Sequence, residues 1–226
     1  MSIIDVKNLS AYYENSRVFE NVSFSVQEGD YLCIIGENGS GKTTLMKTLL
    51  GINIKHTGSV RFEGFTKREI GWLPQKTQHQ KDFPASVREV VLSGFAGKGF
   101  FGAFYKKEIK NQALKNMQIL GITDIAEKSF SELSGGQQQK VLLCRALCAA
   151  KKVLLLDEPV TGLDSASSEE MYNLIKKLNA SGMAIIMISH DIDRSLCEAK
   201  HILNLTDNGF FFGTVSEYRE YAKGDK

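Results

Sequence analysis

A glycine-rich segment constrains this chain more than any other: Gly36-Glu-Asn-Gly-Ser-Gly-Lys-Thr43 fits G-x-x-x-x-G-K-[ST] at every fixed position. An apolar run (31–35) precedes it and a helix-like stretch (44–50) follows it. The glycines let the backbone turn tightly, so that its N–H groups point inward, and the next helix adds its positive end. The segment therefore predicts a nucleotide-phosphate site, with Lys42 reaching the β- and γ-phosphates and the Thr43 hydroxyl reaching Mg²⁺.

Two more short apolar runs, 153–156 and 184–188, are typical of parallel strands buried on both faces. The first run ends in two adjacent acids, Asp157 and Glu158. In a chain that also carries a phosphate loop, we expect Asp157 to hold the Mg²⁺ shell. Glu158 is then placed to polarise the attacking water as a general base.

Other segments show helical or alternating periodicity. Residues 22–26 and 59–62 alternate as half-exposed strands do, which predicts an antiparallel, β-rich part over about 1–30 and 58–72. Apolar stripes at helical spacing comprise Met171, Leu174, Ile175 and Leu178 in one segment and Ile109, Ala113, Met117 and Leu120 in another. Asp164 and Ser165 are N-cap types ahead of the first stripe, and Asp207-Asn-Gly209 predicts a hairpin. We expect one domain over 1–226, with a helical insertion at about 85–135.

Composition excludes several classes. Apolar residues make up 42% and charged residues 24% of the chain, near globular averages of about 45–50% and about 25%, so the chain is not disordered. A net charge of +2 gives no strong field for nucleic acid or anionic lipid. The N-terminal residues do not resemble a signal peptide, and no run approaches the roughly 20 apolar residues of a membrane span. The four cysteines match no zinc pattern and are expected to be buried free thiols.

The segment Leu133-Ser-Gly-Gly-Gln137 adds a second feature for anion binding. Two glycines between a serine and a glutamine expose backbone N–H groups and a hydroxyl at a helix start. Two phosphate-recognising elements in one chain suggest that two chains share nucleotides, with the phosphate loop of one facing Ser134–Gly136 of the other.

Together these motifs resemble the ATP-binding subunit of an ATP-binding cassette (ABC) transporter, over nearly the whole chain. The matching segments are 36–43 (Walker A), Gln75 (Q-loop), 133–137 (signature), 153–157 (Walker B, followed by Glu158), 161–164 (D-loop) and His190 (switch histidine). Tyr13, with Tyr12 as the alternative, matches the aromatic residue that stacks on adenine. The chain departs mildly from the family pattern at Glu37, where proline is commoner, and at Lys140, where arginine is frequent.

The resemblance implies an α/β P-loop NTPase fold of the ABC ATPase type, with an antiparallel β subdomain and a helical insertion, and without the C-terminal regulatory domain that some family members carry. It implies ATP hydrolysis with ATP and Mg²⁺ as cofactors. It assigns catalysis to Lys42, Gln75, Glu158 and His190, and Mg²⁺ coordination to Thr43, Gln75 and Asp157. The residues that it places against ATP are Tyr13, Gly36, Glu37, Asn38, Gly39, Ser40, Gly41, Lys42, Thr43, Thr44, Ser134, Gly135, Gly136, Gln137 and Asp164.

Within the family, the segments 71–77, 82–84 and 86–94 resemble zinc and manganese importers, with zinc the first expectation and manganese the second. The resemblance implies a homodimer formed with ATP, integral membrane permease subunits as partners and, indirectly, a metal-binding protein. It places the chain peripherally at the cytoplasmic face of the cell membrane, with no nucleic-acid partner. Residues from Gln75 to about Tyr105 are expected to form the permease dock.

Other functions remain open at this point. The alternatives to a zinc or manganese importer are an ABC ATPase of another importer and a soluble ABC ATPase acting on DNA or ribosomes. The short spacing from Thr43 to Leu133 leaves no room for the long coiled coil of the ATPases that act on DNA. A small-molecule kinase would explain neither 133–137 nor His190. A catalytically silent scaffold would not need Lys42, Asp157 and Glu158 intact.

Overall fold

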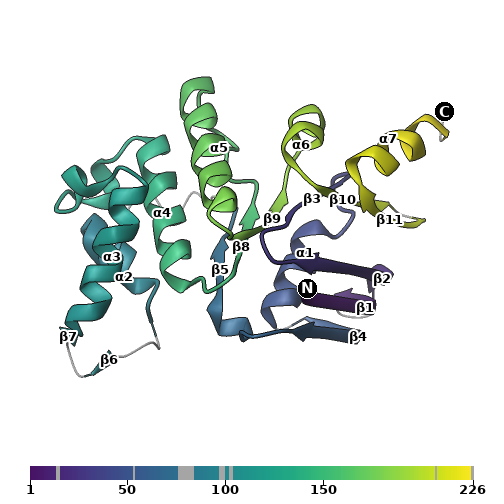
Figure 1. The fold of residues 1–226 in the computed structure, drawn as a ribbon, viewed down its shortest axis with the longest axis horizontal. Coiled ribbons are helices and arrows are strands. Elements are labelled where there is room, and N and C mark those ends of the chain that lie inside the picture. The colour runs from purple at the N-terminus through teal and green to yellow at the C-terminus, as the bar shows by residue number, and fades with distance from the viewer. Residues whose placement is uncertain are drawn as a thin grey trace.

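Six strands form a sheet through the middle of the molecule in the order β11-β10-β3-β9-β8-β5 (Figure 1). The computed structural model describes residues 1–13, 16–52, 54–75, 84–96, 100–101, 104–206 and 208–224. The strands are β3 (Tyr31–Gly36), β5 (Ile70–Leu73), β8 (Val153–Asp157), β9 (Ala184–Ile188), β10 (His201–Thr206) and β11 (Gly209–Thr214). All neighbours pair in parallel except the hairpin β10–β11. The parallel strands and the hairpin predicted from the apolar runs are therefore confirmed, although Asp207 lies outside the described residues.

A second, antiparallel sheet has the order β2-β1-β4 and comprises β1 (Ser2–Tyr13), β2 (Ser16–Gln27) and β4 (Lys55–Phe62). The alternating segments 22–26 and 59–62 lie in β2 and β4, as predicted. Ile70–Leu73 does not belong with them, because it pairs in parallel with β8. Ile70 packs into the core on one face of the central sheet and Leu73 into the core on the other, as in a parallel strand buried on both faces. Over Gly71 a helix packs closely, since a Cβ there would lie 2.3 Å from the Ala146 carbonyl oxygen.

The α-helices of the described residues are α1 (Lys42–Leu50), α2 (Val87–Ser93), α3 (Lys107–Ile119), α4 (Gly135–Ala149), α5 (Ser165–Ala180), α6 (Ile192–Glu198) and α7 (Val215–Gly224). Short 3₁₀ turns include η1 (Lys67–Glu69), η3 (Thr123–Ile125) and η4 (Phe130–Glu132), and β6 (Phe100–Phe101) pairs with β7 (Phe104–Tyr105). Helices α2, α3 and α4 gather at one end of the molecule, away from the antiparallel sheet (Figure 1). In the described part of the chain, no helix combines the length and apolarity that crossing a membrane requires.

The central sheet separates two hydrophobic cores. Alternate residues of β3 divide between them, because successive strand side chains point to opposite faces. Leu32 and Ile34 join the core with β1, β2 and α1, whereas Cys33 and Ile35 join the core with α2 to α5. Burial on both faces explains why the central strands read as continuous apolar runs.

The cysteines follow the expectation with one exception. Cys33, Cys144 and Cys148 are buried free thiols, as predicted. Cys197 is exposed, so the expectation of a buried thiol is wrong there. It lies on α6, a two-turn helix with only one buried residue, Ser195.

Candidate active site

The phosphate loop connects β3 to α1 and depends on glycine backbone conformations. Gly36, Gly39 and Gly41 all have positive φ, a region that side chains with a Cβ rarely occupy. A Cβ on Gly36 would also lie 2.2 Å from the Leu205 carbonyl oxygen. Gly41, at φ 92°, is the N-cap of α1, so the positive end of the helix opens into the loop.

Lys42 reaches back over this loop. Its Nζ donates hydrogen bonds to the carbonyl oxygens of Gly36 (2.8 Å) and Glu37 (2.6 Å). Burial lowers the pKa of Lys42, and the nearby carboxylates of Glu158 and Asp157 oppose that effect. The ammonium group is thus held inside the loop, where an anion would gain most from it.

A cavity of about 220 Å³ lies against the loop. It is lined by residues from four regions of the chain: Val18, Asn38, Gly39, Gly41, Lys42, Thr43, Thr44, Glu158 and His190. Backbone N–H groups, one lysine and two threonines therefore line a space beside two of the predicted catalytic side chains.

Asp157 and Thr43 form a pair of oxygen ligands at the ends of neighbouring elements. Thr43 Oγ1 donates to Asp157 Oδ1 at 3.5 Å, across the carboxyl end of β8 and the start of α1. Burial raises the pKa of Asp157, and the hydrogen bond from Thr43 opposes that rise. Carboxylate and hydroxyl oxygens are hard donors of the kind Mg²⁺ prefers, so this pair fits the metal that the sequence predicts.

Glu158 joins three other parts of the site. Its Oε2 accepts hydrogen bonds from Gln75 Nε2 (2.8 Å) and Thr161 Oγ1 (3.0 Å), and its Oε1 lies 2.6 Å from His190 Nε2. The Glu158 side chain is only 11% exposed, against 47% for His190. The structure therefore brings together three residues predicted to be catalytic: Gln75, Glu158 and His190.

The backbone at Glu158 is strained. Its φ is 51°, the left-handed region that costs a non-glycine residue about 1–2 kcal/mol. Because this turn breaks the alternation of β8, Glu158 leaves the strand direction directly after Asp157. Strain of this kind is typical of functional sites whose surroundings hold the conformation in place.

Thr161 is the contact to Glu158 that sequence reasoning missed. We assigned 161–164 to the D-loop without giving Thr161 a partner. The signal was its position in a turn, since Thr161 N donates to the Glu158 carbonyl oxygen at 3.3 Å. A hydroxyl three residues beyond a strand-end acid can therefore fold back onto that acid.

The signature segment lies at the N-terminus of α4. Ser134 is the N-cap and forms a capping box with Gln137: Gln137 N donates to Ser134 Oγ (3.3 Å), and Ser134 N donates to Gln137 Oε1 (3.1 Å). Gly136 packs against α5, where an added Cβ would lie 2.7 Å from Ser167 Oγ. None of residues 134–137 lines the cavity at the phosphate loop of the same chain.

Asp164 is the N-cap of α5 rather than part of the cavity. Its Oδ1 accepts from Ser167 N (2.9 Å), and its Oδ2 accepts from Ser167 Oγ (2.7 Å). These hydrogen bonds hold the pKa of Asp164 below its usual range. Ser167 therefore contacts both Gly136 and Asp164, which ties the signature segment to the D-loop.

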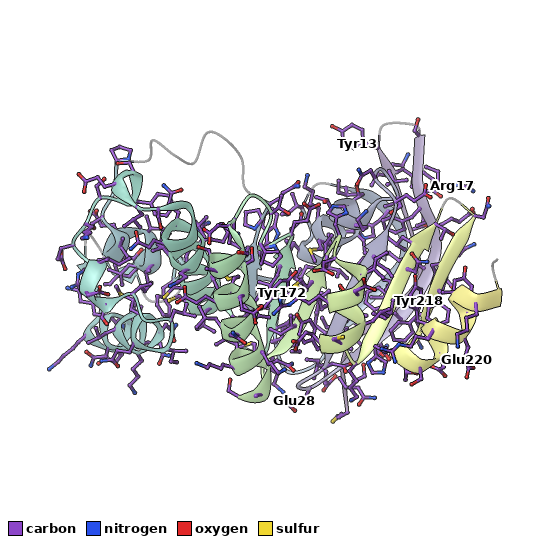
Figure 2. The ribbon with its side chains drawn as sticks, turned by 90° about the horizontal axis from the view of Figure 1, so that it is seen from above. Tyr13, Arg17, Glu28, Tyr172, Tyr218 and Glu220 are labelled. Atoms are coloured by element: carbon purple, nitrogen blue, oxygen red, sulfur yellow. The ribbon has the colours of Figure 1, made fainter. Side chains whose placement is uncertain are left out.

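Tyr13 lies at the end of β1 with 66% of its surface exposed, and in Figure 2 its ring points away from the body of the molecule. It does not line the phosphate cavity. Its predicted stacking on adenine therefore stays a prediction. The importer-like residues Asp82 and Phe83, and much of the predicted permease dock (76–83, 97–99 and 102–103), lie outside the described residues.

Fold and site together define a P-loop nucleoside triphosphatase with a second helix N-terminus suited to anions. The sequence model of the ABC transporter family matches residues 19–161. The chain belongs to this family as an ATP-binding subunit and is an ATPase. The predicted fold class and enzyme class are thereby confirmed.

Individual relatives agree with this assignment. The zinc uptake system ATP-binding protein ZurA of Listeria innocua is 35% identical over 97% of this chain and 88% of its own length. The manganese transport system ATP-binding protein MntB of Bacillus subtilis is 34% identical over 84% of this chain and 77% of its own. A solved structure of a metal-chelate type ABC transporter, facing inward, superposes with a TM-score of 0.86 at 30% identity, covering 96% of this chain and 85% of that one.

Proposed function

We propose that the chain hydrolyses ATP to drive an importer of zinc or manganese. The observation that carries the catalytic part is the Glu158 carboxylate, which Gln75, Thr161 and His190 hold beside the phosphate loop. The cargo rests on the relatives, since ZurA is a zinc uptake protein and MntB a manganese transport protein.

The proposed chemistry assigns each group one task. Backbone N–H groups of 36–44 and the Lys42 ammonium bind the phosphates, and Tyr13 stacks on adenine. Thr43, Asp157 and Gln75 hold Mg²⁺, which neutralises charge on the phosphate oxygens when bound. Glu158 accepts a proton from the attacking water, and His190 donates a hydrogen bond to the γ-phosphate.

Glu158 accepts hydrogen bonds on both oxygens in this structure. Each carboxylate oxygen can accept more than one hydrogen bond, so Oε1, which His190 contacts, can still accept a proton from the attacking water. We infer that His190 turns from Glu158 to the γ-phosphate when ATP binds, because it is the more exposed of the pair and its proposed target is the phosphate.

We further propose that two copies sandwich two ATP molecules head to tail. The residues that would act across the interface are Ser134, Gly135, Gly136, Gln137 and Asp164. The position of 134–137 outside the cavity of their own chain supports this arrangement. ATP must then bind the closed dimer more tightly than the open one, and hydrolysis reopens it.

The proposed partners are integral membrane permease subunits, with a metal-binding protein acting indirectly. We place the chain peripherally at the cytoplasmic face of the membrane. Its net charge of +2 supports no role on nucleic acid. The second candidate is the ATPase of a different importer, since the energy-coupling factor transporter ATP-binding protein EcfA1 of Fusobacterium nucleatum is 32% identical over 91% of this chain.

Whole-cell metal content, measured element by element, tests the cargo. Cells carrying Glu158→Gln are compared with wild type and with Glu220→Gln, the same chemical change on the exposed face of α7. A selective fall in zinc or manganese with Glu158→Gln alone supports the proposal and identifies the ion. Unchanged metals, with ATPase activity abolished in vitro, would contradict metal import and favour another cargo.

A further inference from the structure

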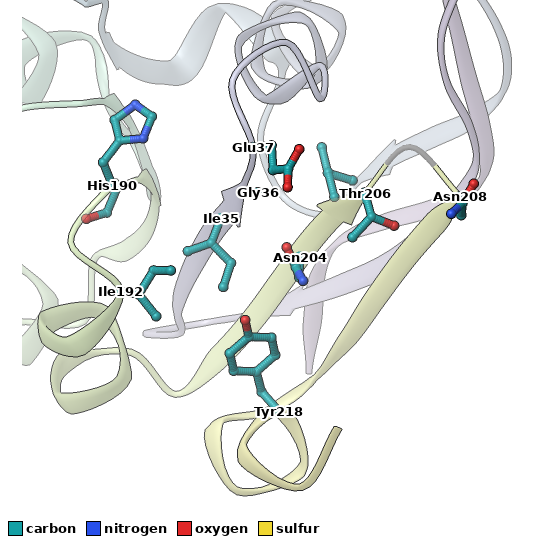
Figure 3. A pocket seen from close by; sticks show the side chains of 11 residues that line it. Ile35, Gly36, Glu37, His190, Ile192, Asn204, Thr206, Asn208 and Tyr218 are labelled. Carbon is teal, nitrogen blue, oxygen red and sulfur yellow. The ribbon is translucent and has the colours of Figure 1, made fainter. Parts of the chain in front are cut away.

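The segment that carries His190 borders a large cavity on one side (Figure 3). The cavity measures about 530 Å³. Ser189, His190 and Ile192 line it, and we call residues 189–192 the switch segment. Asn204 of β10 and Tyr218 of α7 lie on the far side. Ile192 is 47% exposed, so packing on this side does little to hold the segment.

On its other side the segment is held by Arg194 of α6. The Arg194 guanidinium lies over the ring of Tyr172 in α5, with Cζ 3.9 Å from the ring centroid. Its Nη1 donates to Glu169 Oε2 at 2.6 Å. The Arg194 side chain is only 26% exposed, and Tyr172 is buried. A planar guanidinium can stack and form an ion pair at once, which an ammonium group does less well.

The same contacts reach the residues on either side of His190. Asp191 Oδ1 accepts from Arg194 N at 2.9 Å and caps α6. Asp191 N donates to Ser189 Oγ at 3.1 Å. Burial raises the pKa of Tyr172, beneath the guanidinium, and the Ser189 side chain opposes that rise, so Tyr172 also interacts with the residue before His190. Arg194 and Tyr172 thus restrain the backbone both before and after His190.

We propose that Arg194 is a positioning residue, which holds the switch segment against α5 so that His190 stays within reach of Glu158 and the phosphate cavity. This inference rests on the proposed role of His190. Asp164, the last residue of the D-loop, is the N-cap of α5, so Arg194 also links His190 to the helix that directly follows the D-loop. Neither Arg194, Glu169 nor Tyr172 lines the phosphate cavity, so none of them touches the reacting groups.

The test compares ATP turnover of the full-length chain with Arg194→Ala, Arg194→Lys and Lys176→Ala. Lys176 is the matched control, because it forms the other ion pair between α5 and α6, with Glu198 at 3.2 Å. We expect Arg194→Ala to lower kcat by roughly 10- to 100-fold with little change in KM, since misplacing a catalytic group costs rate. Arg194→Lys should recover part of the loss, and Lys176→Ala should behave as wild type.

A nuclear magnetic resonance signal of the His190 ring provides a readout independent of rate. The chain has four histidines, so the signal is assigned by its loss in His190→Ala. We expect it to shift in Arg194→Ala and to stay in place in Lys176→Ala. Thermal unfolding of each variant shows whether the chain remains folded. Glu169→Gln is a milder variant, because it removes only the negative charge that pairs with Arg194.

The outcomes separate the two proposals. If His190→Ala keeps wild-type kcat, the proposed role of His190 fails whatever Arg194 does. If His190→Ala loses activity but Arg194→Ala and Glu169→Gln match Lys176→Ala in kcat and in the His190 signal, the positioning role is wrong.

Discussion

Two helix N-termini in this chain are suited to anion binding, and they differ in which other groups of a nucleotide site lie around them in the same chain. The start of α1 opens into a cavity that also holds Lys42, Glu158 and His190. The start of α4 caps itself through Ser134 and Gln137 and faces no such group of its own chain in the described cavity. The comparison teaches that binding groups are assembled within one chain at α1, whereas α4 would contribute to the reaction only through the proposed head-to-tail dimer.

The largest effect is expected from Glu158→Gln. The amide keeps the size of the carboxylate but cannot accept a proton, so we expect kcat to fall by at least about 100-fold, as for other general bases. ATP binding should persist, because the phosphate loop is untouched. Size-exclusion chromatography with ATP should then show a stable dimer. A chain that elutes only as a monomer would contradict the proposed sharing of ATP.

Mixing two inactive chains tests the comparison directly. Lys42→Ala removes the ammonium group from the phosphate loop, and Ser134→Arg blocks the start of α4. Each variant alone should have almost no turnover. A mixed head-to-tail dimer keeps one complete site, so the mixture should regain at most about a quarter of wild-type activity if chains pair at random. Activity no higher than that of either parent would mean that α4 does not act across an interface.

Gly136→Ala is expected to lower turnover to an intermediate extent, because it displaces α4 and leaves the phosphate loop unchanged. Its Cβ would lie 2.7 Å from Ser167 Oγ and 3.0 Å from Ser167 Cβ, so α4 must shift against α5. We expect kcat to fall about tenfold, comparable to the loss of one modest transition-state contact. Binding of labelled ATP to the monomer should be unchanged. Adding Ser167→Ala removes the nearest atom and should restore part of the activity.

Local motifs made the phosphate loop and the parallel strands predictable. A turn such as 36–43 is encoded by contiguous residues, and strands buried on both faces are continuously apolar. Contacts that depend on tertiary packing could not be predicted from the sequence in this way. Ile70–Leu73 pairs in parallel with β8 and α4 packs over Gly71, and no local pattern records either contact. The Thr161 contact to Glu158 depends on the left-handed backbone turn at Glu158, and the Arg194 stack on Tyr172 depends on how α6 packs against α5, so only the structure identifies them.

The smallest expected effect concerns Asp164, which caps α5 in the isolated chain and is proposed to act across the dimer. Asp164→Ala removes the acceptor for Ser167 N, so thermal unfolding at neutral pH should occur a few degrees lower. Because folding lowers the pKa of Asp164, its charged form stabilises the chain above the unfolded pKa of about 3.9. That contribution is lost as pH falls through the folded pKa, so the deficit of the alanine variant should shrink in acid.

Asp164→Asn is the matched control, since asparagine caps helices about as well without a titrating charge. It should keep the wild-type unfolding temperature at neutral pH. It should lose only the part of the pH dependence of stability that comes from the titration of Asp164. A parallel measurement of ATP turnover then separates the two roles of the side chain. If Asp164→Asn unfolds as wild type but loses turnover, Asp164 acts beyond its own helix. If both stability and turnover stay at wild-type values, Asp164 serves α5 alone, and the signature segment 134–137 is left as the part of the chain proposed to act on the partner's nucleotide.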